Sequence, residues 1–206
     1  MEPIPPGVHR LVSECEGLPF NVYVVEANGL LAIDAGTALT PAEVTVPFIR
    51  DALDAQCAPS LDLLAVTHAH ADHCGGAAAL RQAFPGLQIA ATPQTGQWME
   101  DHHLNVCYSY GSLREDWPLA KEVEQQFLAL LGEEQAPTTY LHDGEGIGLG
   151  AGDALQVIAT PGHCPGHAAF YWQTGKLLFS GDALQGRGIP PGDSPLYLPV
   201  LSLIHI

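Results

Sequence analysis

The sequence predicts an α/β protein in which two packed β-sheets are flanked by helices. Short apolar runs bounded by turn residues occur in both halves of the chain, helical segments lie among them, and one strand–turn–strand plan occurs twice. With 206 residues, 47% of them hydrophobic, the chain can bury one substantial core, so a single domain is expected.

The first predicted strands form a hairpin. Residues 20–36, "FNVYVVEANGLLAIDAG", read as two β-branched strands that meet at Asn28-Gly29, a dipeptide that tolerates the positive φ angles of a tight turn. Two further apolar runs, residues 61–67 and 87–92, are short and also fit strands.

Three segments have helical character. Residues 40–57 begin with a threonine that can cap a helix and a proline at its first position, although Pro47 should kink this helix or delay its start. Residues 75–84 are rich in alanine, and residues 118–132 form an amphipathic pattern that ends at a glycine. Residues 94–118, which precede that last helix, are predicted to be irregular, either covering a site or padding the core.

From residue 138 onward, the runs "TTYLHDG", "ALQVIAT", "HAAFYW" and "KLLFS" predict further short strands separated by Gly, Asp and Pro turns. Residues 167–183 repeat the plan of residues 21–36, namely strand, Xaa-Gly turn, apolar strand and aspartate beside small residues. Asp34 and Asp182 occupy matching places in this repeat, which suggests two similar β-rich halves.

The charge balance argues against polyanionic partners. Seven Lys plus Arg stand against 23 Asp plus Glu, a formal net charge of −16, which repels nucleic acid and anionic membrane surfaces. An acidic surface can also serve solubility alone. The start "MEPIPPGVHR" lacks a signal-peptide pattern, and no apolar run approaches the roughly 18 residues of a membrane span, so a soluble cytoplasmic protein is expected.

The cysteines indicate neither a disulfide framework nor a cysteine zinc site, because they are odd in number, scattered and without a C-x-x-C pair. We expect most of them to be small buried residues. They are Cys15, Cys57, Cys74, Cys107 and Cys164.

The segment "THAHADHCGG", residues 67–76, concentrates metal-ligand side chains. His68 and His70 project to the same side of extended backbone and can reach one ion, whereas Asp72 and His73 follow a turn and can approach a second. The spacing therefore predicts a pair of metals. The alternatives are a group of surface histidines or a closed structural zinc site, which more often uses cysteine.

The motif resembles the T-H-x-H-x-D-H signature of the metallo-β-lactamase superfamily. Three further motifs match in the expected order: "IDAG" at 33–36, "TPGHCPGH" at 160–167 and "FSGDA" at 179–183. The likeness covers about residues 8–190 and is closest to the glyoxalase II and thioesterase or lactonase branch. It implies a four-layer αββα sandwich of two mixed sheets flanked by helices.

The resemblance also implies a set of ligands and two zinc ions, with iron as an alternative. The implied metal ligands are His68, His70 and His163 for the first ion, Asp72 and His73 for the second, and Asp182 as the bridge. Asp72 and His167 are the candidate catalytic residues, His167 by orienting a ligand or the substrate. Asp34 is interpreted as a structural carboxylate that bonds nearby backbone.

The implied activity is that of a zinc-dependent hydrolase, similar to hydroxyacylglutathione hydrolases, in which a metal-bound hydroxide cleaves a thioester or lactone of a small molecule. One alternative is an enzyme similar to persulfide dioxygenases, which use a single iron. The other is a catalytically impaired metal-binding fragment of the parent enzyme. The sequence gives no indication of the oligomeric state.

The end of the chain departs from the family pattern. The family normally supplies another histidine ligand of the second metal some tens of residues beyond the bridging aspartate, and the only later histidine here is His205. Residues 201–206, "LSLIHI", are expected to be a non-native tail, with residues 1–200 forming a domain that is incomplete at its C-terminus.

Overall fold

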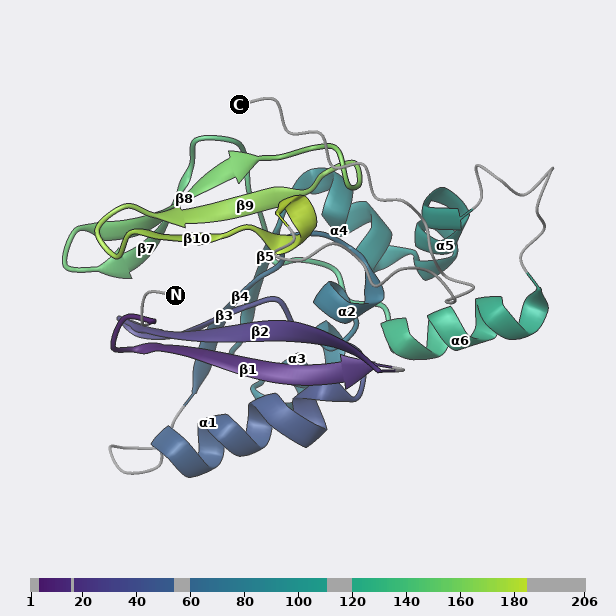
Figure 1. Ribbon diagram of the computed structural model, residues 1–206, viewed down its shortest axis with the longest axis horizontal. Coiled ribbons are helices and arrows are strands. Elements are labelled where there is room, and N and C mark those ends of the chain that lie inside the picture. The colour runs from purple at the N-terminus through teal and green to yellow at the C-terminus, as the bar shows by residue number, and fades with distance from the viewer. Residues whose placement is uncertain (1–3, 16, 54–59, 111–119, 185–206) are drawn as a thin grey trace.

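The computed structural model describes residues 4–15, 17–53, 60–110 and 120–184, which form two β-sheets and a group of helices (Figure 1). The larger sheet has the strand order β1 (Val8–Cys15), β2 (Leu18–Ala27), β3 (Gly29–Ile33), β4 (Leu61–Ala65), β5 (Gln88–Ala91) and β6 (Thr139–Tyr140). The smaller sheet has the order β10 (Leu177–Phe179), β9 (Ala168–Trp172), β8 (Asp153–Ala159) and β7 (Gly146–Gly150).

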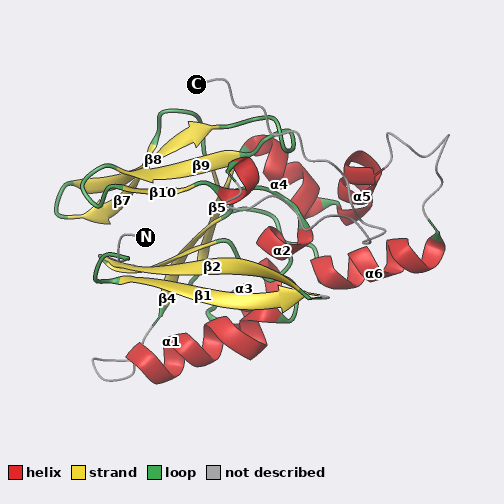
Figure 2. Cartoon of the chain, viewed as in Figure 1, coloured by secondary structure: helices red, strands yellow, loops and turns green. Residues whose placement is uncertain are grey.

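The connections between strands set their directions. In the larger sheet β1, β2 and β3 are antiparallel, whereas β3 to β6 are parallel and are joined by segments that carry the helices (Figure 2). Those helices are α1 (Val46–Leu53), α2 (Ala71–Cys74), α3 (Ala77–Ala83), α4 (Pro93–Glu100), α5 (His102–Tyr110) and α6 (Lys121–Leu131). The smaller sheet is antiparallel throughout its described strands.

Each face of the larger sheet carries its own core. Leu64 of β4 packs with the helix residues Ile49 and Leu80 on one face. Ala65, the next residue, packs on the other face with Phe170 of β9, between the two sheets. This alternation follows from the two-residue period of a strand, and burial on both faces explains why β4 is almost entirely apolar.

The predicted fold class is confirmed, because two sheets pack together and helices cover the outer face of the larger one. The smaller sheet differs from the predicted pair of mixed sheets, since its strands follow one another through turns and every described pairing is antiparallel. Within the described ranges no helix covers the outer face of this sheet (Figure 1).

The predicted hairpin at Asn28 and the strands at residues 61–67 and 87–92 are confirmed. The prediction of an irregular segment over residues 94–118 was wrong for α4 and α5. The overlooked signal was Thr92-Pro93, which starts α4 as cap and first-turn proline, with the Thr92 Oγ1 accepting a hydrogen bond from the Thr95 amide at 3.3 Å.

The strands β1 and β7 were not predicted from the sequence. The segment that forms β1 mixes charged and apolar residues because it lies at an edge of the larger sheet, where one face is exposed. The segment "GIGLG" that forms β7 is rich in glycine, which is usually depleted in strands. Neither sequence therefore carries a strong strand signal.

Pro47 delays its helix, as predicted. A π-helical turn, Pro41–Thr45, comes first, and the regular α-helix α1 begins at Val46. The Val46 amide donates to the Pro41 carbonyl five residues back. This wider turn fits the requirement of a proline, whose ring clashes with the carbonyl four residues before it in a regular helix.

The predicted boundary at residue 200 and the tail 201–206 lie outside the described residues, so they remain predictions. Among the helices of the described residues, none is long and apolar enough to cross a membrane.

The contact between the sheets predicts the effect of truncating Phe170, which is fully buried. Phe170→Ala should lower the free energy of unfolding by about 3–5 kcal/mol, because it removes apolar contacts and leaves a cavity. Leu178→Ala, at a residue 46% exposed in the neighbouring strand β10, should change it by less than about 1 kcal/mol. Urea unfolding measures both values, and equal losses would contradict this description of the core.

Candidate metal centre

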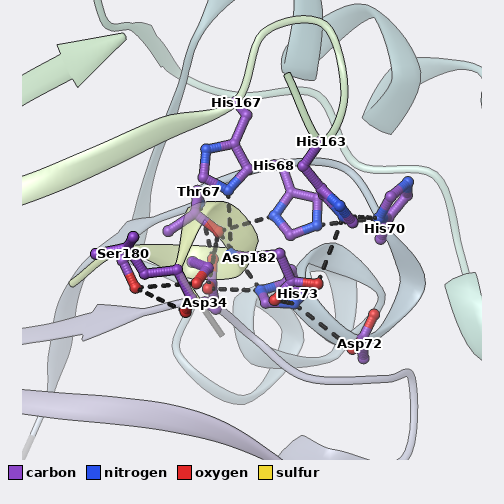
Figure 3. Close-up of polar contacts among 12 residues, drawn as sticks. Asp34, Thr67, His68, His70, Asp72, His73, His163, His167, Ser180 and Asp182 are labelled. Atoms are coloured by element: carbon purple, nitrogen blue, oxygen red, sulfur yellow. Dashed lines mark hydrogen bonds and ion pairs between the residues drawn. The ribbon is translucent and has the colours of Figure 1, made fainter. Parts of the chain in front are cut away.

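The predicted metal ligands gather at one end of the two sheets (Figure 3). Three segments carry them: the turn from β4 into α2 with His68, His70, Asp72 and His73, the loop between β8 and β9 with His163, and the 3-10 turn after β10 with Asp182. A hydrogen bond from the Ala168 amide to the Thr67 carbonyl, 2.9 Å, joins the two sheets beside them. The site is therefore built where the sheets meet.

Three imidazoles form the first donor group. His70 Nδ1 lies 3.1 Å from His68 Nε2 and 2.8 Å from His163 Nε2. Zinc–nitrogen bonds of about 2.0–2.1 Å in a tetrahedral site hold nitrogens about 3.3 Å apart, so both separations are close to those of nitrogens that share one ion. These side chains come from two loops far apart in sequence, and they fit a metal site.

A second donor group lies beside the first. His73 Nε2 is 3.3 Å from Asp182 Oδ1 and 3.5 Å from Asp72 Oδ2, and His73 and Asp182 also form a potential metal group with His68. The other carboxylate oxygen of Asp182, Oδ2, lies 3.4 Å from His163 Nε2. One carboxylate thus faces a histidine of each group.

Asp34 holds His73 from behind. Its Oδ2 lies 2.8 Å from His73 Nδ1, and its Oδ1 accepts a hydrogen bond from the Thr67 amide at 2.7 Å. The Thr67 hydroxyl also donates to this carboxylate. Asp34 thus bonds nearby backbone, as interpreted from the sequence, but its bond to a ligand histidine was not foreseen. With Nδ1 occupied, His73 presents Nε2 to the donor group.

His167 contacts the backbone of Asp182 rather than a ligand atom of either donor group. Its Nδ1 lies 2.7 Å from Thr160 Oγ1, and its Nε2 accepts a hydrogen bond from the Asp182 amide at 3.2 Å. Gly181 has a positive φ of 49°, and a Cβ there would lie 2.7 Å from His167 Nε2. The close approach requires glycine beside Asp182, and both ring nitrogens of His167 are engaged.

Burial keeps four histidines neutral. It lowers the pKa of His70 to about 4, with His163 nearby adding to the effect, and it lowers the pKa of His167 to about 4 as well. The pKa values of His68 and His163 are also lowered, again chiefly by burial. Neutral imidazole is the form that binds metal ions.

In the second donor group the histidine pKa is shifted in the opposite direction. Burial alone would lower the pKa of His73, but Asp72 and Asp34, together with Asp182, outweigh burial and raise it well above its usual value. Burial likewise acts to raise the pKa of Asp182, yet His73 lowers it below the ordinary range. Clustered carboxylates of this kind favour a positive charge among them, which suits a cation.

Two cysteines directly follow ligand histidines in the sequence, and an aromatic pair lies on the neighbouring helices α4 and α5. Cys74 and Cys164 are buried, as expected, and burial raises the pKa of the Cys164 thiol to about 12, which disfavours a thiolate ligand. Tyr108 is exposed and stacks on Trp98 with ring centroids 5.6 Å apart. His205 lies outside the described residues.

Known proteins resemble this chain in sequence and fold. The family model described as "Metallo-beta-lactamase superfamily" matches residues 17–203. The uncharacterized protein YobT of Bacillus subtilis (strain 168) is 30% identical over 82% of this chain and 64% of its own length. A hydroxyacylglutathione hydrolase of Gloeobacter violaceus is 28% identical over 83% of this chain and 54% of its own length.

A metallo-beta-lactamase family protein of Thermus thermophilus has a similar fold, with a TM-score of 0.71 and 23% identity over 90% of this chain and 62% of that chain. The chain matches less than two thirds of the length of each of these three proteins. The likeness therefore extends over most of this chain but only part of its relatives.

The contact between Asp34 and His73 predicts a selective loss of metal. Asp34→Ala should weaken the binding of a metal ion at His73 by about 10–100-fold, because the imidazole loses the partner that orients it. Asp62→Ala is a matched control, since Asp62 also accepts a backbone hydrogen bond, from the Leu30 amide, but is exposed. Zinc titration in competition with a chelator measures both variants, and the prediction fails if Asp34→Ala binds zinc as the parent does.

Proposed function

Because the chain belongs to the metallo-beta-lactamase superfamily, we propose that it is a zinc-dependent hydrolase that cleaves a thioester or lactone of a small molecule. The observation that carries this proposal is the position of Asp182, with one oxygen 3.3 Å from His73 of the second donor group and the other 3.4 Å from His163 of the first. A carboxylate placed in this way suits a bridge between two metal ions.

The proposed ligands divide into two sets. The first ion is assigned to His68, His70 and His163, and the second to Asp72 and His73, with Asp182 shared between them. Imidazole nitrogen and carboxylate oxygen, without cysteine, are typical of catalytic rather than structural zinc sites. The small nitrogen separations in the first set, 2.8 and 3.1 Å, support this assignment.

When bound, a pair of zinc ions supplies Lewis acidity, which lowers the pKa of a coordinated water and polarises a carbonyl. Other residues of the chain hold the proposed metal ligands in position. His73 is held by Asp34 on one ring nitrogen, and the Asp182 backbone is held by His167. These bonds fix two of the donors before substrate arrives, which lowers the reorganisation that catalysis requires.

We assign different roles to the two catalytic candidates. The Asp72 side chain is 41% exposed beside His73, so it can both bind metal and accept a hydrogen bond from the attacking water. His167 is buried and bonded at both ring nitrogens, so it is a positioning residue that acts through Asp182. Neither role requires substrate to reach the His167 ring.

Two considerations support the substrate class. A relative 28% identical over 83% of this chain is named a hydroxyacylglutathione hydrolase, and that name describes hydrolysis of a thioester. A thioester or lactone also presents an electrophilic carbonyl, which suits a site that can polarise an oxygen and orient a water. The net charge of −16 favours a small molecule over nucleic acid as the partner.

The proposal predicts the effect of removing one ligand. His70→Ala should bind less zinc and lower the hydrolysis of a hydroxyacylglutathione thioester by more than about 100-fold, since loss of a mere partner of a ligand costs roughly 10–100-fold. His103→Ala, at an exposed histidine of α5, should leave both unchanged. Thioester turnover and metal content of the purified variants test this expectation.

The metal content also separates the proposal from its main alternative. The parent chain should hold close to two zinc ions and hydrolyse the thioester. One iron per chain, together with oxygen uptake on a persulfide substrate, would overturn the hydrolase assignment. Zinc binding without turnover of either a thioester or a lactone would argue for a metal-binding fragment instead.

A further inference from the structure

We infer that Asn105 of helix α5 is a positioning residue of the metal centre, because it holds the peptide between His68 and His70 in place. This inference rests on the proposed function only in that these two histidines share a metal ion. The Asn105 Nδ2 donates a hydrogen bond of 2.5 Å to the carbonyl oxygen of Ala69. Asn105 lies 35 positions beyond His70, and no motif in the sequence marks it as functional.

The hydrogen bond is buried at both ends. Asn105 is 3% exposed and Ala69 is 1% exposed. A buried carbonyl oxygen needs a hydrogen-bond partner, since water cannot replace a partner that is removed. Loss of the Asn105 amide would therefore leave the Ala69 carbonyl to find a new arrangement, and the two flanking histidines would move with it.

The orientation of the Asn105 amide is determined by a second contact. The Ser109 hydroxyl, one helical turn further along α5, donates to Asn105 Oδ1 at 3.1 Å. With the oxygen engaged there, the NH₂ group faces Ala69, where it meets an acceptor. The network thus distinguishes asparagine from an ionised aspartate, which has no donor to offer.

Helix α5 is itself firmly held, so it can serve as a support. Asp101 Oδ1 accepts a hydrogen bond from the Leu104 amide at 2.8 Å, which caps the start of the helix. The His102 amide donates to Glu134 Oε1 at 3.0 Å. The Tyr108 ring stacks on Trp98 of α4. These contacts anchor α5 at several points along its length.

The Ala69 peptide also connects the two loops of the first donor group. The Ala69 backbone lies close to the thiol of Cys164, the residue that follows His163, and it partly offsets the effect of burial on the pKa of that thiol. Asn105 therefore acts at the point where the loop of His68 and His70 meets the loop of His163. Metal sites tolerate displacements of only about 0.5 Å in their ligands, so loosening this peptide should weaken metal binding.

The test compares zinc affinity in variants of the full chain by competition with a chelator. Asn105→Asp keeps the size of the side chain but, once ionised, removes the donor, and it should weaken the binding of zinc at His68, His70 and His163 by about 10–100-fold. Val106→Ala is the matched control, because Val106 is a buried residue of the same helix. It should lower the melting temperature of the metal-free chain while changing zinc affinity less than about threefold.

Ser109→Ala provides a second test in case Asn105→Asp does not fold. Ser109→Ala keeps the Asn105 donor and removes only the contact that fixes the orientation of the amide. It should therefore weaken zinc binding less than Asn105→Asp and more than Val106→Ala. Unchanged zinc affinity in Asn105→Asp, or an equal loss in Val106→Ala, would overturn the inference. Turnover is not part of this test, so tight zinc binding without thioester hydrolysis would count against the proposed function alone.

Discussion

The hydrogen bonds of the buried Asp34 carboxylate are the interaction on which the centre depends. Asp34 directly follows β3, and it bonds the Thr67 amide just beyond β4 and the His73 ring of α2. Burying a carboxylate without hydrogen-bond partners would cost several kcal/mol of folding free energy. The folded chain therefore keeps the Thr67 amide and the His73 ring bonded to Asp34. Its left-handed φ of 62° is a strained conformation that the surrounding bonds maintain.

The repeat seen in the sequence has a structural counterpart at His73. Asp34 follows the hairpin of the larger sheet and lies 2.8 Å from His73 Nδ1, whereas Asp182 follows the hairpin of the smaller sheet and lies 3.3 Å from His73 Nε2. One imidazole is thus flanked by equivalent aspartates of the two halves. Asp34 orients the ring, and we propose that Asp182 binds the same metal ion as His73.

Patterns among adjacent residues were sufficient to predict much of the fold and to indicate much of the candidate site. The ligand spacing around His68 and the apolar run of β4 are properties of adjacent residues, which a sequence displays directly. The roles of His167 and Asn105 depend instead on contacts with Asp182 and Ala69, 15 and 36 positions away. Such pairings arise only when the sheets and α5 come together, and neither residue type identifies its partner.

The central claim is that two metal ions flank the Asp182 carboxylate. A crystal structure of the zinc-loaded chain, with anomalous scattering measured at the zinc edge, tests it most directly. We expect two anomalous peaks, one among His68, His70 and His163 and one beside Asp72 and His73, with an Asp182 oxygen bound to each. A single peak, or two peaks that Asp182 does not join, would contradict this claim.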